Sequence, residues 1–402
     1  MAFRNVFIPY GGYWCTPFVK WQGNFASLHP LTFAAEVAKR ALAERKIQPS
    51  VFDALYLGLT VPAKSSFYGA PWAAALIGAE GITGPTFSQA CATSARVIGS
   101  AAFEVEAANG GGGVILCLTA DRTSNGPHMT YPNPNSPGGK PDAEDWVWDN
   151  FNNDPFARNA MIQTAENTAR EEEITTEEQH EVMLIRYGQY QDALKDEAAF
   201  HKRYMVTPVE VNPSGKKVIA AVKDDEGVFP TAADGLAKLK PVLPNGTVTF
   251  GAQTYPADGN AGMIVTTKER AAELSREAGI TIQILSFAQG RAKKGFMPMA
   301  NIPATKAALE LAGVGIGEMK AIKTHNPFAV NDICFSRAMG VKKEAMNNYG
   351  SSLIWGHPQG PTGMRLTMEL IEELVLLGGG YGLFTGCAAG DTAAAVVVKV
   401  GG

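Results

Sequence analysis

The stretch Thr281-Ile282-Gln283-Ile284-Leu285 opens the part of the sequence that decides the fold. This short apolar run predicts a β-strand, and residues 304–312 follow with apolar side chains at the three- and four-residue spacing of a helix. Residues 319–322 then give a second strand pattern. A strand, a helix and a strand in this order predict a βαβ unit, in which the two strands run parallel in one sheet.

The first third of the chain repeats this order of elements. Residues 5–9 predict a strand, residues 31–46 a helix and residues 53–57 the next strand. Each half continues with a long helix and closes with a glycine cluster and an apolar run, over residues 91–108 and 110–118 in the first half and residues 363–377 and 378–400 in the second. The duplicated set predicts an α/β protein in which two sheets pack together.

A stretch of different composition separates the two halves. It contains a loop rich in proline, asparagine and glycine (132–141), a charged helix pattern (166–196) and a loop rich in lysine and arginine (201–223). Inserted loops often carry binding residues, although a solvated charged face has the same composition. We therefore divide the chain into a first half, an inserted loop domain and a second half: residues 1–120 with 248–270, residues 121–247 and residues 271–402.

The composition excludes several classes of protein. The chain has 402 residues, 46% of them hydrophobic, which is enough for a large core in more than one lobe. Because 35 Lys and Arg face 39 Asp and Glu, the net charge is −4 and no nucleic-acid partner is expected. No apolar run reaches the roughly 20 residues that cross a bilayer, and residues 1–10 are too short and interrupted for a signal peptide. We therefore expect a cytoplasmic protein without membrane contact.

The five cysteines include one candidate nucleophile. None of them forms a CxxC pair, so we expect free thiols and no metal site in this chain. Cys91 lies among small residues at the start of a predicted helix, where backbone N–H groups and the helix dipole favour a thiolate. A small buried side chain is an equally good interpretation of this stretch alone, Ser88-Gln89-Ala90-Cys91-Ala92-Thr93-Ser94-Ala95.

Three further segments place polar groups in rigid turns. In Gly356-His357-Pro358-Gln359-Gly360-Pro361-Thr362-Gly363 a histidine could take a proton from a thiol or donate to an oxyanion. Gly386-Cys387-Ala388-Ala389-Gly390 offers a second thiol and free N–H groups, although such turns are frequent. His325-Asn326-Pro327-Phe328 follows a predicted strand, where α/β folds bind ligands, and a structural turn is an equally good interpretation.

Taken together, these four segments resemble the motifs of the thiolase family, and the resemblance covers nearly the whole chain. Cys91 and Ser94 match its CxS pattern, residues 356–363 resemble its GHPxGxSG signature, and residues 386–390 stand where it has a second cysteine and a glycine run. Residues 163–167 are similar to its TAEN segment, and residues 239–259 to a stretch that contacts coenzyme A. The resemblance implies a duplicated βαβ core of two mixed sheets, with helices between and outside them, plus an inserted loop domain.

The resemblance also implies an acyltransferase that uses coenzyme A as co-substrate and holds no permanent cofactor or metal. Cys91 would give its proton to His357 and attack a thioester, and Cys387 would act as acid and base on the α-carbon. Backbone N–H groups of Cys91 and Ala389 would bind one oxyanion, and His357 and His325 would stabilise another. Three residues are implied for binding coenzyme A: Thr254, Lys223 and Met161.

The sequence departs from the family pattern near these residues. His325 stands where the family motif Asn-Glu-Ala-Phe has its asparagine, and Ala95 replaces a glycine. Thr254 stands in Gln253-Thr254-Tyr255-Pro256, where the family has a serine in a turn of small residues. The histidine resembles a thiolase subgroup that works with a small zinc-ribbon/OB-fold partner. This resemblance implies a branched or aromatic 3-oxoacyl-CoA substrate, such as benzoylsuccinyl-CoA, rather than acetyl-CoA.

Alternative functions remain open on the same fold. They are an acetyl-CoA C-acetyltransferase in the biosynthetic direction, a non-catalytic acyl-CoA or lipid carrier, and a condensing synthase. Cys91, His357 and Cys387 together count against a carrier, which needs none of them, and condensing synthases usually have histidine in place of Cys387. The family also implies a homodimer or homotetramer, because its two-sheet core usually pairs through edge strands.

Overall fold

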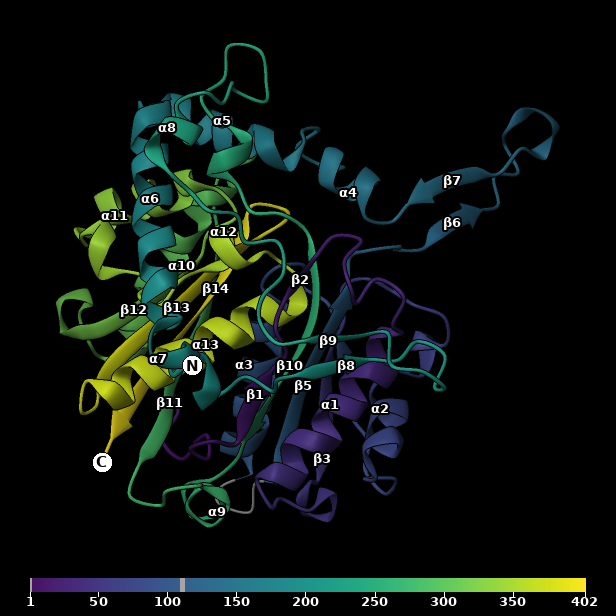
Figure 1. The fold of residues 1–402 in the computed structure, drawn as a ribbon, viewed down its shortest axis with the longest axis vertical. Coiled ribbons are helices and arrows are strands. Elements are labelled where there is room, and N and C mark those ends of the chain that lie inside the picture. Colours follow the sequence, from purple (N-terminus) through teal and green to yellow (C-terminus); the bar gives the residue numbers. More distant parts are fainter. Residues whose placement is uncertain (1, 109–112) are drawn as a thin grey trace.

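The computed structural model describes residues 2–108 and 113–402 and contains two large sheets (Figure 1). Six strands form the first sheet: β1 (Tyr13–Cys15), β2 (Val19–Lys20), β3 (Ala54–Gly58), β4 (Thr86–Phe87), β5 (Ile115–Arg122) and β10 (Ala257–Val265). Their order is β1-β10-β5-β3-β4, with β2 also paired to β10. Strand β10 is antiparallel to β1 and β5, whereas β3 is parallel to β5 and β4.

The second sheet repeats this arrangement. Its strands are β11 (Thr281–Arg291), β12 (Met319–His325), β13 (Gly380–Ala388) and β14 (Thr392–Gly401). They follow the order β11-β14-β13-β12, in which β14 is antiparallel to both neighbours and β12 is parallel to β13. Each strand therefore has a counterpart in the first sheet, and the predicted duplication of an α/β core is confirmed.

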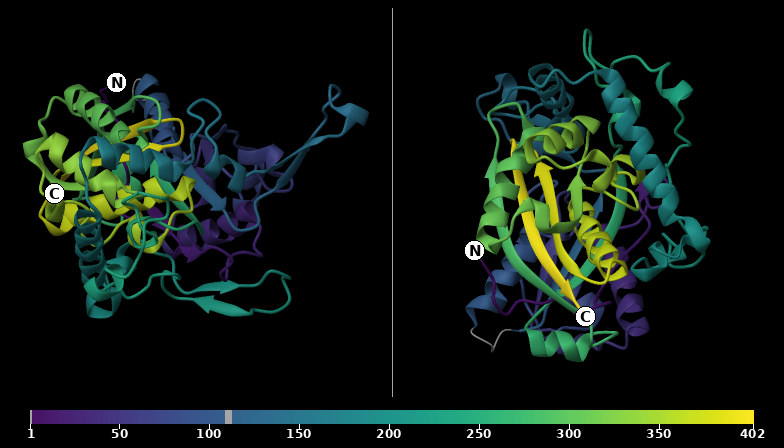
Figure 2. Two further views of the ribbon diagram at one scale, coloured as in Figure 1. Left: turned by 90° about the horizontal axis from the view of Figure 1, so that it is seen from above. Right: turned by 90° about the vertical axis from the view of Figure 1, so that its left-hand side faces the viewer.

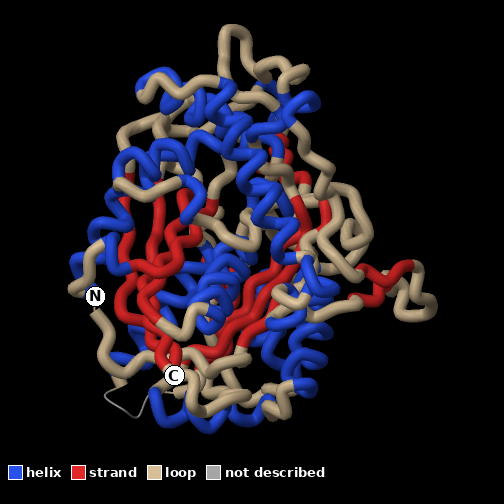
Figure 3. The backbone as a smooth tube through the Cα atoms, turned by 60° about the vertical axis from the view of Figure 1, so that its left-hand side comes forward, coloured by secondary structure: helices blue, strands red, loops and turns tan. Residues whose placement is uncertain are grey.

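Two long helices lie between the sheets, as the family resemblance implies (Figure 3). They are α3 (Thr93–Ala107) and α13 (Gly360–Leu376), which pack against each other and against strands of both sheets. Every residue of α13 from 360 to 374 is buried, as expected of a helix covered on all sides. The outer faces are covered by α1 (Pro30–Glu44) and α2 (Gly69–Ile77) on the first sheet and by α10 (Asn301–Ala312) on the second.

The segment between β5 and β10 forms a layer over the core and a projecting hairpin. The hairpin, β6 (His128–Tyr131) with β7 (Asp142–Asp145), extends away from the body of the molecule (Figures 1 and 2). Helix α6 (Thr176–Ala193) packs on α11 (Ala329–Met339) and α12 (Ser352–Trp355) of the second half. The remaining elements of this segment are α4 (Trp148–Asn152), α5 (Met161–Glu171), α7 (Lys195–Ala198), β8 (Val209–Val211), β9 (Ala220–Val222) and α8 (Ala233–Leu236).

Several expected elements differ in detail from the structure. Residues 5–9 form isolated bridges instead of a regular strand. Phe7 exchanges backbone hydrogen bonds with Thr266, directly after β10 of the first sheet, whereas Val6 and Ile8 bond to β11 of the second sheet. The charged helix expected over 166–196 is interrupted after α5, because Glu173 has a φ of +52° and Thr175 caps a new helix by a capping box with Glu178. The loop expected over 201–223 contains the β8–β9 hairpin.

Two further expectations concern the glycine cluster near residue 110 and the boundaries between the parts of the chain. The glycine cluster that opens residues 110–118 lies largely outside the described residues, and the boundaries drawn at residues 121, 248 and 271 stay predictions. Helix α9 (Lys268–Leu274) connects the two halves. Among the described residues, no helix combines the length and the apolar character that crossing a bilayer requires.

Candidate active site

Cys91 lies in a strained turn between β4 and the start of α3. The preceding residue, Ala90, has a φ of +43°, a backbone conformation that costs a non-glycine residue free energy and often marks functional sites. Thr93 holds the turn, because its Oγ1 accepts a hydrogen bond from Gln89 N at 2.8 Å and donates one to Ala90 O at 2.7 Å. Cys91 is half-buried, so its thiol is presented from a fixed backbone next to a helix N-terminus.

His357 occupies an equivalent place before α13. Its backbone N–H donates to Tyr255 O at 2.9 Å, and its carbonyl accepts from Ala257 N at 3.3 Å. Its Nδ1 lies 2.6 Å from the hydroxyl of Thr362, and Gln359 has a φ of +52° in the turn that follows. The imidazole is therefore fixed through its backbone and through one ring nitrogen.

A buried acidic side chain and a serine hydroxyl hold the start of α13. Asp121, near the end of β5, accepts hydrogen bonds from Gly360 N at 2.7 Å, from Thr60 N and Oγ1, and from Val61 N. A Cβ at Gly360 would lie 2.7 Å from the Asp121 carboxylate, so the approach requires glycine. Ser94 in α3 donates to the Gly360 carbonyl. Asp121 and Ser94 therefore fix the turn that carries His357 relative to the helix that follows Cys91.

His325 completes a cluster with Cys91 and His357. It ends β12 and is fully buried, and its ring centroid lies 4.1 Å from that of His357. The Cys91 sulfur and one nitrogen of each histidine all lie within 4.8 Å of one another. The His325 Nδ1 atom lies 2.8 Å from the Ser352 hydroxyl, as the His357 Nδ1 lies beside Thr362. The structure thus brings three of the predicted site residues together.

Cys387 and Ala389 reach the same cluster from the turn between β13 and β14. The backbone N–H of Ala389 bonds to the sulfur of Cys91 and lowers the pKa of that thiol. Cys387 is buried, and Asn331 donates to its sulfur at 3.2 Å. Burial, and then the neighbouring Cys91, raise the pKa of the Cys387 thiol. The two thiols therefore interact, and an N–H group suited to an oxyanion points at the first of them.

The ionisation states follow from burial. Burial raises the pKa of Cys91 to about 12, although the N–H groups of Ala389 and of Cys91 itself oppose this shift. Burial lowers the pKa of His357 to about 3, and burial together with His357 holds that of His325 well below its usual value. At neutral pH the cluster therefore holds a thiol and two neutral imidazoles, and each imidazole can accept a proton.

The three residues expected to bind coenzyme A lie in different places. Thr254 is close to the cluster, because its N–H donates to Pro327 O at 2.8 Å and its hydroxyl to Ser352 O at 2.5 Å. Met161 begins α5 and packs, half-buried, against the central core. Lys223 follows β9 and is exposed, and its carbonyl accepts a hydrogen bond from Thr207. The structure places only Thr254 in contact with residues that hold the cluster.

Four residues that support the site were not singled out by the sequence patterns. Thr362 lies inside the quoted motif 356–363 and could have been found there. Asn331 and Ser352 come from helices without a distinctive motif, and Asp121 looks like an ordinary polar residue at a strand end. Their roles depend on contacts between distant segments, which one sequence does not reveal.

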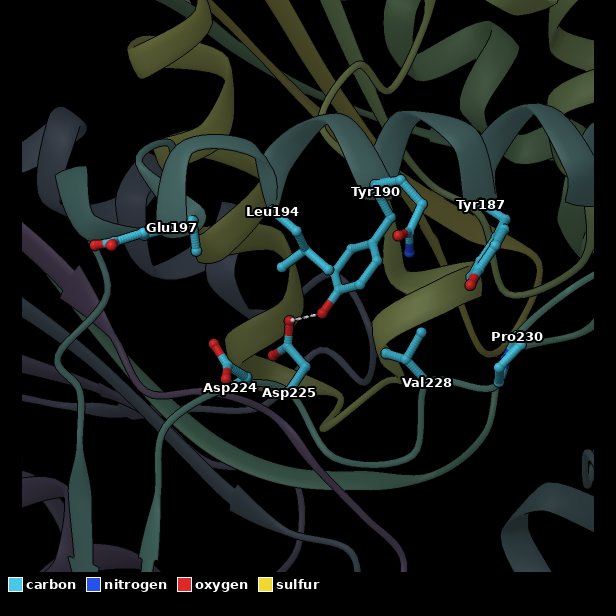
Figure 4. Close-up of a pocket in the computed structure, with 10 residues that line it drawn as sticks. Tyr187, Tyr190, Leu194, Glu197, Asp224, Asp225, Val228 and Pro230 are labelled. Atoms are coloured by element: carbon cyan, nitrogen blue, oxygen red, sulfur yellow. Dashed lines mark hydrogen bonds between the residues drawn. The ribbon is translucent and has the colours of Figure 1, made fainter.

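A second hollow lies away from this cluster. A pocket of about 550 Å³ opens between α6 and residues 224–230 (Figure 4). Tyr190 points to Asp225 across its floor and donates to it at 3.2 Å, and Asp225 in turn binds the buried Arg365 of α13. Asp224 and Glu197 also line the pocket. These two carboxyl groups make the lining unfavourable for phosphate groups.

Comparisons with known proteins agree with this arrangement. Residues 13–269 match the thiolase N-terminal domain, and residues 279–400 match the thiolase C-terminal domain. The beta-ketothiolase BktB of Cupriavidus necator is 32% identical over 61% of each chain. The acetyl-CoA acetyltransferase of Escherichia coli is 28% identical over 94% of this chain and 95% of its own length. A crystal structure of human mitochondrial 3-ketoacyl-CoA thiolase with CoA aligns at a TM-score of 0.89 over 100% of both chains, with 24% identity.

The chain belongs to the thiolase family. It is an acyltransferase of that family, with coenzyme A as co-substrate. The site has the groups that acyl transfer needs, namely a thiol, a neutral base beside it and a backbone N–H at the sulfur.

Proposed function

We propose that this protein cleaves a branched or aromatic 3-oxoacyl-CoA, such as benzoylsuccinyl-CoA, with free coenzyme A through an acyl-Cys91 intermediate. The observation that carries the proposal is the convergence of Cys91, His357 and His325 within 4.8 Å, with Cys387 interacting with the same thiol. A carrier protein would need none of these groups in one place.

The first step would form the acyl-enzyme. His357 is neutral and its Nδ1 lies beside the Thr362 hydroxyl, so its Nε2 can take the Cys91 proton when Nδ1 carries the hydrogen. The sulfur then attacks the 3-oxo carbon, and the bond to the α-carbon breaks. N–H groups of Cys91 and Ala389 would hold the carbonyl oxygen as negative charge develops on it.

The second thiol would complete the cleavage. Cys387 would protonate the α-carbon of the departing acyl-CoA, and Asn331 would stabilise the resulting thiolate through its hydrogen bond. His325 and His357 would stabilise the enolate oxygen of that leaving group. Free coenzyme A would then attack acyl-Cys91 and release the second thioester product.

The substrate class is inferred from the residue that replaces the usual asparagine. His325 is fully buried and its ring centroid lies 4.1 Å from that of His357, so this part of the site differs in shape from an amide-lined one. We infer that Thr254, Met161 and Lys223 contact coenzyme A, with Thr254 nearest the reacting thioester because it is bonded to Ser352. We also propose a cytoplasmic homodimer or homotetramer that works with a small zinc-ribbon/OB-fold partner.

One specific observation favours a second candidate, acetyl-CoA C-acetyltransferase activity in the biosynthetic direction. The acetyl-CoA acetyltransferase of Escherichia coli is similar over 94% of this chain. Thiolysis of acetoacetyl-CoA and benzoylsuccinyl-CoA, each with and without the candidate partner, separates the two functions. We expect kcat/KM to be at least about tenfold higher for benzoylsuccinyl-CoA. A higher value for acetoacetyl-CoA under both conditions would favour the second candidate.

A further inference from the structure

The three side chains proposed to take part in acyl transfer also form a set of donor atoms that suits a metal ion. One thiol and two imidazole nitrogens lie within 4.8 Å of one another. Zinc bonds of about 2.0–2.3 Å place tetrahedral donors about 3.3–3.8 Å apart, so these side chains need to approach by at most about 1.5 Å. Sulfur and imidazole donors are the ligands that zinc prefers.

The hydrogen bonds leave one ring nitrogen of each histidine, Nε2, available to bind a metal ion. Nδ1 of His325 and of His357 each lies beside a hydroxyl, of Ser352 and of Thr362. The Nε2 atoms of both histidines are buried and have no hydrogen-bond partner among the described residues. A metal-binding histidine typically donates its other ring N–H to an oxygen atom, and both hydroxyls can accept such a bond.

The neighbours of His325 allow the tautomer that a metal requires. Asn326 donates from its Nδ2 to Asp332 at 2.7 Å, which fixes the amide so that its Oδ1 faces Ser352. The Ser352 hydroxyl can donate to that Oδ1 at 3.1 Å and accept from the Nδ1–H of His325. The lone pair of His325 then lies on Nε2, the ring nitrogen without a hydrogen-bond partner among the described residues.

We propose that Cys91, His325 and His357 bind a zinc ion with an open fourth position, and that this ion reversibly withholds the nucleophile from acyl-CoA. The inhibitory effect rests on the proposed role of Cys91, whereas the metal binding does not. When zinc binds, the Cys91 S–H bond breaks, its proton leaves to solvent, and a zinc–sulfur bond forms as water leaves the ion. The Nε2 atom of His357 is then coordinated too and cannot accept a proton.

The charges around the cluster are compatible with a bound cation. Zinc with one thiolate leaves one positive charge in a buried region, and Asp121 is the acidic group that acts on the Cys91 thiol. Burial raises the pKa of Asp121 to about 7, and its deprotonated form would offset part of the charge of the ion.

Cobalt and zinc titrations test the site directly on the full chain. Co²⁺ reports a bound thiolate by a charge-transfer band and tetrahedral geometry by its intense visible bands. We expect the wild type to show both, Cys91→Ala to lose the thiolate band, and His325→Asn to weaken Zn²⁺ binding by at least about 100-fold. Cys117→Ala, which removes a buried thiol of β5 outside the cluster, is the matched control and keeps the band.

A second readout does not depend on any variant folding correctly. Zn²⁺ added to the wild type should protect Cys91 from alkylation by iodoacetamide, and EDTA should restore the reaction. A thiolate band that persists in Cys91→Ala, or unprotected alkylation at saturating Zn²⁺, overturns the proposal. Failure of the EDTA-treated wild type to form an acyl adduct contradicts the proposed function instead, and leaves the metal titration as an independent result.

Discussion

The two halves of the molecule share one strand arrangement but differ in one connection. In the first half, residues 123–256 join β5 to β10, whereas residues 389–391 alone join the corresponding strands β13 and β14 in the second. The long connection supplies the projecting hairpin and α6. The short one directs Cys387 and Ala389 toward Cys91. The same connection in a duplicated fold is thus a covering layer in one half and a short turn beside Cys91 in the other.

The two central helices, in contrast, are alike in the two halves: each begins next to a residue of the candidate site. Cys91 lies just before α3 and His357 just before α13, and each is next to or near a residue with positive φ, Ala90 and Gln359. Ser94 bonds the two helix starts together. In the proposed mechanism, the first half therefore contributes the nucleophile Cys91. The second half contributes the base His357, the second thiol and His325, and the two packed helices hold both sets in place.

The largest effect should come from removing the second thiol. Cys387→Ala should lower carbon–carbon cleavage by about 10⁴-fold, because the proposed mechanism assigns protonation of the α-carbon to Cys387. The variant should still form the acyl adduct on Cys91 when a simple acyl-CoA is the donor. Steady-state cleavage rates and intact-protein mass spectra measure the two steps separately. Cleavage near the wild-type rate would show that the acid lies elsewhere.

The next effect concerns the buried ion pair between Asp225 of the inserted segment and Arg365 of α13. Arg365 is buried and binds Asp225 with two hydrogen bonds, at 2.7 and 2.9 Å. Arg365→Met would leave that carboxylate buried without its cation, which should lower the free energy of unfolding by about 3–5 kcal/mol. Urea denaturation measures this loss. The control Lys343→Met removes a partly exposed pair with Glu181 and should cost at most about 1 kcal/mol. Equal losses of unfolding free energy in the two variants would show that the buried ion pair matters no more for stability than the exposed one.

A smaller effect should follow from removing the base. His357→Asn should slow acylation of Cys91 by about 10²-fold, since the amide cannot take the thiol proton. Thr362→Val, which removes only the hydroxyl beside Nδ1, should slow it by about tenfold. Rapid quenching followed by mass spectrometry gives both rates. An unchanged rate in His357→Asn would show that another group takes the Cys91 proton.

The smallest effect is a pH dependence of the free enzyme. Because the Cys91 pKa is about 12 and that of His357 about 3, the resting pair is neutral and the thiolate fraction grows with pH. Alkylation of Cys91 by iodoacetamide should therefore accelerate about tenfold per pH unit from about pH 7 to 9. The alkylated Cys91 peptide is quantified at each pH. A rate that is constant over this range would indicate a thiolate–imidazolium pair already present at rest.

Much of the fold could be predicted from the sequence because its elements are regular and repeated. The strand over residues 281–285 and the helix over 31–46 have strong periodic patterns, and the structure confirms both. Residues 5–9 were expected as a strand but form only isolated bridges to both sheets, since a short apolar run does not say which strands it joins. The break after residue 171 was missed because the capping box at Thr175 lies inside a continuous run of charged residues.

The sequence predicts only those site residues that lie within distinctive motifs. His357 and Cys91 lie in short turns with distinctive residues, and the structure brings them together with His325. The supporting contacts of Asp121 and Ser352 join segments that are far apart in the chain, so no local pattern marks them. Only the family resemblance implies that Lys223 binds coenzyme A. Its exposed position after β9 leaves this role a proposal.

The most direct test of the account is to locate the acyl group on the protein. The wild type is incubated with benzoylsuccinyl-CoA or acetoacetyl-CoA, quenched in acid and digested, and each cysteine peptide is weighed. We predict an acyl mass shift on the peptide that contains Cys91, none on the Cys387 peptide, and no shift in Cys91→Ser. An acyl group on Cys387, or one that persists in Cys91→Ser, would contradict the assignment of the nucleophile to the first half of the molecule.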